Sequence, residues 1–336
     1  MRAAVLHQFK QPLRLEEVPR PTCGPDDVLL QVEACGVCHT DLHLADGDWA
    51  IFNPYLKLPL ILGHEVVGRV VEKGAAVSHL AVGDRAGVPW IHSTCGQCEF
   101  CRDGRENLCQ RQTITGGTVN GGYAQFMKAR ASHALKVPAA LPPHEAAPLF
   151  CAGLTVYRAC RNAEIKSSQR VAVFGIGGLG HLAVQLARHL GAEVIAVDVA
   201  AGKLELARSL GAAHAFSAEA AVKELQALGG VHVALVTAAS PAAYHAALQS
   251  LRPAGALVVV GLPGEDIAVS PTLLAHGEYK ILCASVGTRD DLRAVLDLAA
   301  AGHLRCRVET RPLEQLNSAL DDLRRGRVSG RISVTP

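Results

Sequence analysis

The distribution of apolar and polar residues divides the chain into parts with different patterns. In residues 1–148, short apolar or alternating runs are separated by Gly, Pro and Asp residues. Such runs are typical of antiparallel β-strands around a barrel-like core. The sequence therefore predicts a β-rich first part, with strands over residues 3–6, 28–34, 66–73 and 85–89.

From residue 149 onward, helix-like and strand-like segments alternate. Helical spacing over 154–161 is followed by the apolar run Arg170–Phe174, a glycine-rich turn, and a helical pattern over 181–190 that Gly191 can cap. Alternating units of this length predict a parallel, doubly wound sheet. The later members of the alternation are expected as strands at Glu193–Asp198, Val231–Val236 and 256–261, and as helices at 203–210 and 241–251.

The pattern changes again after residue 287. Two amphipathic helices are expected over 290–301 and 312–325, followed by a strand over 330–334. We therefore predict an α/β protein of two domains, the first formed by residues 1–148 and completed by 288–336, the second by 149–287.

Composition and charge narrow the class of protein. Of 336 residues, 49% are hydrophobic and 19% are charged, which is typical of a globular chain. Lys and Arg (33) nearly balance Asp and Glu (31), so a nucleic-acid partner is not expected. Apolar runs such as 256–261 are far shorter than the roughly 20 residues of a membrane helix, and the first ten residues resemble a strand rather than a signal peptide. We expect a cytoplasmic protein without a membrane partner.

A glycine-rich turn separates the strand Arg170–Phe174 from the helix that follows it. It carries the dinucleotide fingerprint Gly175-x-Gly177-Gly178-Leu179-Gly180. The first glycine permits the tight turn, the second lets the backbone approach a pyrophosphate, and the last allows close helix–strand packing. Asp198 ends the next strand, where a carboxylate accepts hydrogen bonds from a ribose diol and repels a 2′-phosphate. The pattern predicts NAD rather than NADP; the alternative is a turn that merely connects strand and helix.

Eleven cysteines are many for a chain of this size, and four of them lie within fifteen positions. In a reducing compartment disulfides rarely persist, so such a cluster indicates a metal site. Four thiolates at this spacing can surround one tetrahedral zinc ion and leave no position for water, which indicates a structural role. An iron–sulfur cluster and fortuitously buried cysteines are the alternatives. The four residues are Cys95, Cys98, Cys101 and Cys109.

A second metal site would need ligands from more distant segments. Residues 38–43 combine a thiol, a hydroxyl, a carboxylate and two imidazoles, while His64 precedes the apolar strand 66–71 and Cys151 lies at the domain boundary. Catalytic zinc sites use three protein ligands and keep one position open, and two thiolates with one imidazole form a documented set. A lone cysteine is usually a small core residue, so chemistry alone leaves Cys38, His64 and Cys151 as a hypothesis.

Together, these motifs resemble those of zinc-dependent alcohol dehydrogenases, the two-zinc branch of the medium-chain dehydrogenase/reductase superfamily. The matches extend in the family's order from Cys35 to Arg331. The resemblance implies a GroES-like barrel as the catalytic domain, a Rossmann domain that binds NAD, and two zinc ions per chain, one catalytic and one structural. The matching runs are 34–43, 63–65, 95–109, 151–157 and 175–180 with Asp198.

The resemblance implies roles for the residues around the catalytic zinc. Its ligands are expected to be Cys38, His64 and Cys151. Asp41 would orient His64 from behind, and Glu65 would lie next to the metal, where it can bind during ligand exchange.

A proton relay and a substrate pocket are implied in the same way. Thr40 would hydrogen-bond the alcohol oxygen and pass its proton, by way of the nicotinamide ribose, to His43, which exchanges it with solvent. Trp49 and Trp90 are similar to tryptophans that narrow the pocket in relatives that prefer small alcohols. The segment between Trp49 and Lys57 is longer than in those relatives, which leaves the pocket size open.

The resemblance extends to contacts with NAD. His39 and Arg331 are similar to residues that touch the pyrophosphate, Lys203 matches a lysine beside the adenosine ribose, and Thr155 is placed near the nicotinamide amide. The other positions expected to line the cofactor are Val260, Gly261, Leu262 and Val286.

The predicted activity is the reversible oxidation of primary or simple secondary alcohols to aldehydes or ketones, with NAD as the hydride acceptor. A related polyol or sugar dehydrogenase is the nearest alternative, but these commonly carry a carboxylate where Cys151 stands. A zinc-free quinone reductase would not retain the ligands. A redox sensor that binds NAD without turnover would not need Thr40 and His43. Family analogy favours a homotetramer over a dimer, through the apolar strand 256–261 and nearby 281–286.

Overall fold

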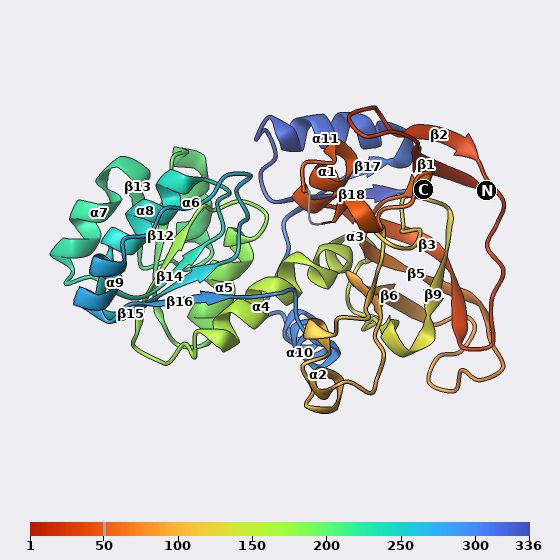
Figure 1. The fold of residues 1–336 in the computed structure, drawn as a ribbon, viewed down its shortest axis with the longest axis horizontal. Helices are drawn as coiled ribbons and strands as arrows, with labels where there is room; N and C mark the ends of the chain where they lie inside the picture. Colours follow the sequence, from red (N-terminus) through yellow and green to blue (C-terminus); the bar gives the residue numbers. More distant parts are fainter. Residues whose placement is uncertain (50–51) are drawn as a thin grey trace. The chain divides into compact units, whose positions relative to one another are not determined.

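The computed structural model describes residues 1–49 and 52–336, and Figure 1 labels its elements. The chain forms two compact units, each assembled from segments that are separate in the sequence. The first unit comprises Met1–Leu154, Thr288–Ala301 and Arg305–Pro336, and the second comprises Thr155–Gly287 and Gly302–Leu304.

The first unit is built mainly from β-strands. Its strands are β1 (Arg2–Leu6), β2 (Arg14–Glu17), β3 (Asp27–Val37), β4 (Leu60–Ile61), β5 (Glu65–Lys73), β6 (Arg85–Val88), β7 (Ile91–Ser93), β8 (Thr113–Ile114), β9 (Phe126–Arg130), β10 (Leu135–Lys136), β17 (Val308–Pro312) and β18 (Arg331–Thr335). The largest sheet has the order β10-β6-β5-β3-β18-β17, and β9 also pairs with β3. The register between β3 and β5 shifts twice, and such irregularities let a sheet curve around a core.

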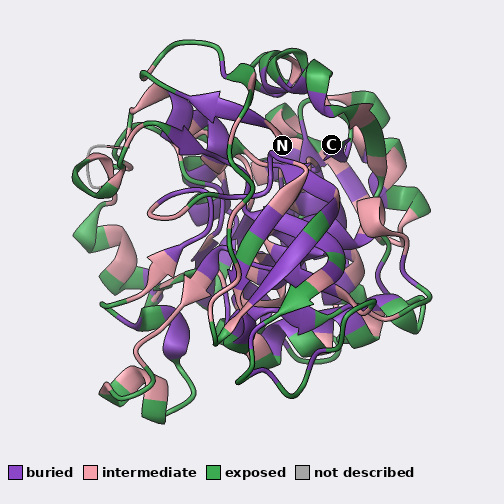
Figure 2. Cartoon of the chain, turned by 90° about the vertical axis from the view of Figure 1, so that its right-hand side faces the viewer, coloured by how far each residue is buried: buried purple, intermediate pink, exposed green. Residues whose placement is uncertain are grey.

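The core of the first unit lies against these central strands. Figure 2 shows the strands as largely buried, and Leu30 of β3 and Val67 of β5 are both fully buried. Smaller sheets of order β2-β1-β4 and β7-β8 complete the strand pairing of this unit. Because apolar residues dominate β3 and β5 on both faces, their short runs were sufficient to predict these strands.

Helices of the first unit are short, apart from α10. They are α1 (His39–Asp46), α2 (Glu99–Arg102), α3 (Pro143–Ala146), α10 (Arg289–Ala300) and α11 (Leu316–Arg324), with 3-10 turns at Asn53–Tyr55, Glu106–Leu108, Ala131–His133, Ala147–Phe150 and Leu313–Gln315. The N-terminus of α10 carries a capping box, in which Thr288 and Asp291 each accept a backbone hydrogen bond from the other. None of the helices in the described part of the chain combines the length and apolar character needed to span a membrane.

The second unit contains a parallel six-stranded sheet of order β13-β12-β11-β14-β15-β16. This is the strand order of dinucleotide-binding folds. Its strands are β11 (Arg170–Phe174), β12 (Glu193–Asp198), β13 (His214–Ser217), β14 (Val231–Val236), β15 (Leu251–Val259) and β16 (Lys280–Cys283), and its helices are α4 (Ala152–Asn162, beginning in the first unit), α5 (Gly180–His189), α6 (Ala201–Ser209), α7 (Ala218–Ala227), α8 (Pro241–Gln249) and α9 (Pro271–Gly277).

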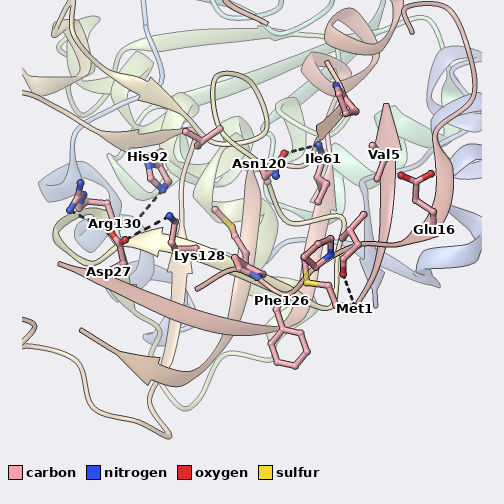
Figure 3. Close-up of a pocket in the computed structure, with 17 residues that line it drawn as sticks. Met1, Val5, Glu16, Asp27, Ile61, His92, Asn120, Phe126, Lys128 and Arg130 are labelled. Atoms are coloured by element: carbon pink, nitrogen blue, oxygen red, sulfur yellow. Dashed lines mark hydrogen bonds and ion pairs between the residues drawn. The ribbon is translucent and has the colours of Figure 1, made fainter. Parts of the chain in front are cut away.

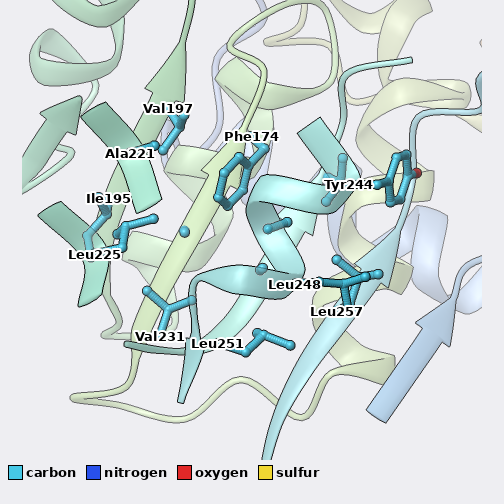
Figure 4. Close-up of a cluster of buried hydrophobic side chains, with 14 residues drawn as sticks. Phe174, Ile195, Val197, Ala221, Leu225, Val231, Tyr244, Leu248, Leu251 and Leu257 are labelled. Atoms are coloured by element: carbon cyan, nitrogen blue, oxygen red, sulfur yellow. The ribbon is translucent and has the colours of Figure 1, made fainter. Parts of the chain in front are cut away.

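One face of this sheet packs against α7 and α8. Alternate residues of β11 and β12, such as Phe174 and Val197, meet Leu225 of α7 and Tyr244 of α8 in one buried cluster (Figure 4). The central strands β11, β12 and β14 are buried, which explains why they appear as continuous apolar runs in the sequence, whereas the edge strands β13 and β16 keep exposed residues.

Some elements lack the apolar pattern that would predict them. In β17 every residue is exposed or half-buried, so no alternation marks it as a strand. The helix expected over 312–325 is shorter in the structure. Residue 312 belongs to β17 and residues 313–315 form a 3-10 turn, so α11 begins only at Leu316. Strand β15 starts at Leu251 rather than at residue 256. Its first residues are largely exposed, so no apolar run marked them as part of the strand.

Candidate active site and metal centres

Three segments that are distant in the sequence bring two thiols, an imidazole and a carboxylate together in the first unit. Cys38 lies between β3 and α1, His64 immediately before β5, and Cys151 immediately before α4. One ligand atom of each, together with one of Glu65, lies within 4.8 Å of the others. The structure therefore places side by side the three residues that the sequence analysis proposed as catalytic metal ligands.

Asp41 ties these segments to one another. Its carboxylate accepts hydrogen bonds from the backbone N–H groups of Cys38 (2.9 Å) and Gly63 (3.3 Å). It also accepts from Nδ1 of His64 (3.0 Å) and from the hydroxyl of Tyr123 (2.8 Å). Because His64 donates from Nδ1, its Nε2 carries the free lone pair that a metal ion requires.

Neighbouring groups shift the pKa values of all three proposed ligands. The hydrogen bond with Cys38, together with burial, raises the pKa of Cys151 well above its usual range. A hydrogen bond with the Cys151 thiol holds the pKa of Cys38 well below its usual range, and His64 acts in the same direction. Burial by itself lowers the pKa of His64, but the charge of Asp41 and its hydrogen bond raise that pKa well above the usual value. Cys38 is thus prepared to act as a thiolate, the form in which cysteine binds metals.

Glu65 and Arg331 form a buried ion pair beside these ligands. Burial raises the pKa of Glu65 to about 7, although the positive charge of Arg331 opposes this shift. Oε2 of Glu65 is buried and has no hydrogen-bond partner among the described residues. A Cβ atom on Gly36 would lie 1.8 Å from Oε2, so the glycine makes room for the carboxylate. The sequence analysis placed Arg331 beside the pyrophosphate. The structure shows its side chain paired with Glu65, next to the proposed ligands.

These residues fit a zinc ion. Nε2 of His64 is fully buried without a hydrogen-bond partner in the part of the chain that the structure describes. Leaving a buried polar atom unsatisfied is costly, which a metal bond would relieve. Cys38 and Cys151 supply two sulfur atoms next to it. Two thiolates and one imidazole leave one tetrahedral position for a substrate.

The four-cysteine lobe forms a second set of ligands. Sγ of Cys95 lies 3.9 Å from that of Cys101 and 3.6 Å from that of Cys109. Sulfur atoms about 2.3 Å from one tetrahedral ion are about 3.8 Å apart. All four sulfur atoms lie within 4.8 Å of one another, which fits one ion rather than an iron–sulfur cluster that separates its cysteines by several atoms. Backbone N–H groups of Gln97 and Cys98 lower the pKa of Cys95 to about 5.

Polar contacts anchor this lobe to α10 within the same unit. Glu106, which is 7% exposed, accepts hydrogen bonds from the backbone N–H of Arg289 (3.0 Å) and from its Nε (3.1 Å). Arg289 also donates to the carbonyl oxygen of Ser132 (2.8 Å). Next to the lobe, Thr94 hydrogen-bonds with the buried His133 (3.2 Å). The lobe is therefore part of the packed unit rather than an appendage.

Helix α1 carries both residues of the predicted proton relay. Thr40 is half-buried in its first turn, and His43 follows three positions later. Nδ1 of His43 donates to the carboxylate of Asp48 (3.0 Å), and the imidazole stacks on Trp49 with ring centroids 4.5 Å apart. Residues three apart share one face of a helix, so both relay side chains can serve one pocket.

A row of aromatic rings connects the relay to the metal ligands. Trp49 contacts Phe52 at 5.4 Å between ring centroids, and Phe52 meets Trp90 edge-on at 6.1 Å. Trp90 in turn meets the ring of His64 edge-on at 5.0 Å. Both tryptophans proposed for the substrate pocket therefore belong to a continuous aromatic wall that ends at the proposed metal ligand.

The glycine turn of the second unit has the geometry expected of a phosphate-binding turn. Gly175 has a φ of +93°, and a Cβ atom on Gly180 would lie 1.8 Å from the Gly175 carbonyl oxygen. A Cβ atom on Gly177 would meet nothing within 4 Å, so the backbone there faces open space. The carboxylate of Asp198 accepts a hydrogen bond from the N–H of Ile176 (2.6 Å), which joins the end of β12 to this turn.

Other proposed cofactor residues follow the carboxyl ends of strands in the same sheet or lie on neighbouring helices. Ligands of doubly wound sheets bind at that edge. Leu262 is exposed, whereas Val260 and Gly261 are buried, and Val286 has a φ of +50°, which is uncommon for a β-branched residue. Of the rest, Gly178 and Leu179 complete the turn, Thr155 lies on α4 and Lys203 on α6, while His39 is exposed on α1 in the first unit.

A cavity of about 510 Å³ in the first unit is lined by none of these residues. Figure 3 shows that charged side chains on its wall pair with one another. Arg130 pairs with Asp27 at 3.4 Å, and Lys128 lies 4.0 Å from the same carboxylate. Because its charges are already neutralised, we assign no ligand to this cavity.

Three residues near the proposed site were missed by the sequence analysis. Asp48 closely follows His43, so an acidic residue beside a proposed base was an available signal. Phe52 lies in the segment between Trp49 and Lys57, of which residues 50–51 fall outside the described part of the chain. Tyr123 has no local signal, because its contact with the site depends on how distant segments pack.

Comparisons with known proteins cover nearly the whole chain. Residues 24–139 match the alcohol dehydrogenase GroES-like domain family, and residues 178–301 match the zinc-binding dehydrogenase family. An alcohol dehydrogenase of Geobacillus stearothermophilus is 47% identical over 335 residues, covering 99% of this chain and 98% of that protein. The alcohol dehydrogenase of Aeropyrum pernix aligns with a TM-score of 0.93 at 36% identity over 100% of both chains. A cobalt- and zinc-bound alcohol dehydrogenase from Pyrobaculum aerophilum aligns with a TM-score of 0.91 at 29% identity, over 100% of this chain and 99% of that one.

Proposed function

The chain belongs to the zinc-dependent alcohol dehydrogenases of the medium-chain dehydrogenase/reductase superfamily, and we propose that it oxidises primary or simple secondary alcohols reversibly to aldehydes or ketones with NAD. The observation that carries this proposal is the set formed by the buried His64 and the half-buried Cys38 and Cys151, in which Nε2 of His64 has no partner among the described residues. Such a set can hold zinc and leave one position for an alcohol.

Zinc held by these residues would act as a Lewis acid and lower the pKa of an alcohol placed at its open position. Asp41 fixes the ring and the tautomer of His64 through the hydrogen bond to Nδ1. Trp90, which is 8% exposed, packs against the other side of that ring and keeps water from it. The chain therefore supplies a rigid and largely dry set of ligands.

The relay proposed for the released proton uses two residues of α1, Thr40 and His43. Thr40 receives the proton from the alcohol, and His43 passes it to solvent. The side chain of His43 is 19% exposed, and Asp48 occupies its Nδ1. Within residues 1–49 and 52–336 no hydrogen bond to Nε2 is found, so this nitrogen can accept a proton. Histidine is suited to this role because it exchanges protons near neutral pH.

The cofactor is proposed to be NAD, which accepts a hydride from the alcohol when bound. The open backbone at Gly177 and the N-terminus of α5 would bind the pyrophosphate. Asp198, at the carboxyl end of β12, would accept hydrogen bonds from the adenosine ribose. Lys203 on the following helix is proposed to lie beside the same ribose.

Asp198→Ala tests this choice of cofactor. Hydrogen bonds to a charged group contribute about 1.5–3 kcal/mol, so the preference for NAD over NADP should fall about 10- to 100-fold. The measurement is kcat/KM with each cofactor. Glu193→Ala, an exposed carboxylate at the other end of β12, is the matched control and should leave the preference unchanged. An unaltered preference in the Asp198 variant would mean that this carboxylate does not face the ribose.

We also propose that the chain works in the cytoplasm as a homotetramer. None of the eleven cysteines forms a disulfide, which suits a reducing compartment. Strand β16 is the last strand of its sheet and exposes Ile281, so a second copy could extend the sheet there. Light scattering after size-exclusion chromatography gives the mass directly; a monomer would contradict this proposal.

The activity itself is tested by following NADH absorbance with a panel of alcohols. We expect turnover with ethanol, butanol or benzyl alcohol, and little with sorbitol. Elemental analysis should give two zinc ions per chain. NAD binding without turnover of any alcohol would instead support a redox sensor, whereas preferential turnover of sorbitol would support a polyol dehydrogenase.

A further inference from the structure

Tyr123 is fully buried in the first unit and lies directly behind the proposed catalytic metal ligands. Its backbone N–H donates to the carbonyl oxygen of Leu62 (3.1 Å), and the preceding Gly122 donates to that of Gly63 (2.9 Å). The segment that carries Tyr123 is therefore hydrogen-bonded, residue by residue, to the segment that leads into His64.

The packing between these two segments is close. Gly63 has a φ of +92°, and a Cβ atom there would lie 2.8 Å from the ring of Tyr123 and 2.8 Å from Sγ of Cys35. The tyrosine ring is thus held against the backbone that positions His64. Its hydroxyl points at Oδ2 of Asp41, 2.8 Å away.

With this contact, both oxygens of the Asp41 carboxylate are fixed by two donors each. Oδ1 accepts from His64 and Gly63, whereas Oδ2 accepts from the backbone N–H of Cys38 and from Tyr123. A carboxylate held at four points cannot rotate without breaking a hydrogen bond. The direction in which it holds the imidazole is therefore fixed as well.

We propose that Tyr123 is a positioning residue for the catalytic metal: it fixes Asp41, and through Asp41 it fixes the orientation of His64. This inference rests on the proposed function, because it assumes that His64 binds the metal. The hydroxyl of Tyr123 reaches the Asp41 carboxylate at 2.8 Å and, at a longer 3.4 Å, the carbonyl oxygen of Gly36. Neither partner is a proposed ligand atom, so the inferred effect on the metal passes through the Asp41 carboxylate.

Phenylalanine at this position would fill the same space but would remove one of the two donors to Oδ2 of Asp41. The ring would still pack against Gly63, so the fold should form. The carboxylate would gain freedom to turn, and the imidazole would be held less well. Loss of such outer contacts typically weakens metal binding by about 10- to 100-fold.

The first measurement is the rate of zinc release to a chromophoric chelator. The wild-type chain should release its two ions in two phases. The phase that is absent from Cys38→Ser belongs to the catalytic set, that is, to Cys38, His64 and Cys151. In Tyr123→Phe this phase should accelerate about tenfold. The phase from the four-cysteine lobe should be unchanged, and it serves as an internal control against general loosening of the unit.

The second measurement is the visible absorption spectrum of the cobalt-substituted protein, because d–d bands report the geometry around the ion. The bands that Cys38→Ser lacks should shift in Tyr123→Phe. Tyr244→Phe is the matched control: this tyrosine is also fully buried and donates its hydroxyl to a carbonyl oxygen, that of Gly261 in the second unit. It should lower the melting temperature without changing the spectrum or either release phase.

A double-mutant cycle shows whether Tyr123 acts through Asp41. Asp41→Asn alone should accelerate the catalytic phase more than Tyr123→Phe does. Because the carboxylate is the link, adding Tyr123→Phe to Asp41→Asn should change the rate less than twofold. Two effects that simply multiply would show that Tyr123 acts by another route and would overturn the inference.

The remaining outcomes separate this inference from the proposed function. If the wild-type and Cys38→Ser chains each contain only one zinc ion, the catalytic set holds no metal, and both proposals fail. If the wild type holds two ions but Tyr123→Phe shows wild-type release and an unshifted cobalt spectrum, only the role of Tyr123 is overturned.

Discussion

The two proposed metal sites of the first unit are built in opposite ways. The four-cysteine lobe takes all its ligands from one short segment, residues 95–109; three of its cysteines are half-buried and Cys109 is buried, and backbone N–H groups donate to the sulfur of Cys95. The catalytic set takes ligands from three distant segments and surrounds them with buried ionisable groups, Asp41, Glu65 and Arg331. The lobe is one type of ligand repeated four times, whereas the catalytic set is a mixture that depends on its neighbours.

This difference explains how the two sites can serve different purposes. Four thiolates close the coordination of one ion, so the lobe can only hold structure together. Three ligands leave a position open, so the catalytic set can act on a substrate, and it needs outer contacts to keep its geometry. Damage to the lobe should therefore reduce stability first, and damage to the catalytic set should reduce turnover first.

Cys38→Ser should give the largest effect on turnover. Without this thiolate the catalytic zinc is lost, and several kcal/mol of Lewis-acid stabilisation go with it; a loss of about 4 kcal/mol corresponds to a rate about 10³-fold lower. Steady-state kinetics and zinc content, expected to fall from two ions to one, check this. Cys23→Ser, a half-buried cysteine outside both sets, is the control. A Cys38 variant with full activity would exclude this residue as a ligand.

Cys101→Ser should reverse the pattern. A hydroxyl is a poor replacement for a thiolate, so the lobe loses its zinc and about 3 kcal/mol of stabilisation by bound metal. The melting temperature should fall by roughly 5–10 °C. Turnover per folded chain should stay within about twofold, since the catalytic ligands are untouched. Loss of turnover at an unchanged melting temperature would contradict the structural role of the lobe.

His43→Gln should reduce turnover less than Cys38→Ser, because the relay assists the reaction without holding the metal. At neutral pH, kcat/KM for alcohol oxidation should fall by at most about 10²-fold. At high pH hydroxide can collect the proton, so the deficit should shrink. The pH profile, with zinc content checked, measures this; His276→Gln, at an exposed residue of α9, is the control. A variant that had lost zinc would identify His43 as a ligand.

The contrast between a local site and a site built from distant segments also decides how much of the molecule could be predicted from the sequence. The cysteine lobe and the glycine turn are local, so their spacing alone indicated a metal site and a dinucleotide site. The grouping of Cys38, His64 and Cys151 depends on distant segments, and it was proposed firmly only through the family resemblance. Tyr123 was missed because its segment reaches Asp41 only through the pairing of residues 121–123 with 61–63.

The fold shows a similar division between buried and exposed elements. Buried strands such as β11 and β14 were predicted with their observed bounds, because continuous apolar runs mark them. Exposed elements such as β17 and short helices such as α1 were not predicted. Their residues carry no apolar pattern, because tertiary contacts hold the polar residues in place. Asp41 illustrates this: it is buried on α1 only because four donors surround it.

The smallest effect expected concerns His133, which supports the lobe through Thr94. Burial, assisted by the charge of Arg289, lowers its pKa from the usual 6.5 to about 4 in the folded chain. Between these two values the unfolded chain binds a proton that the folded chain does not. The stabilisation is therefore fully present above pH 6.5 and is lost progressively as the pH falls toward 4. Each pH unit is worth at most 1.36 kcal/mol, and we expect a stabilisation of about 1–2 kcal/mol in total.

His133→Gln removes this titration, so the free energy of unfolding should depend less steeply on pH between 6.5 and 4.5 than in the wild type. Urea unfolding at several pH values measures the slope. Zinc content must be followed at each pH, because protonation of the thiolates would release the metal in both proteins. His79→Gln, at an exposed histidine of the same unit, controls for the loss of a histidine as such. An equally steep dependence in His133→Gln would assign the acid sensitivity of the lobe to its cysteines rather than to the histidine that packs beside it.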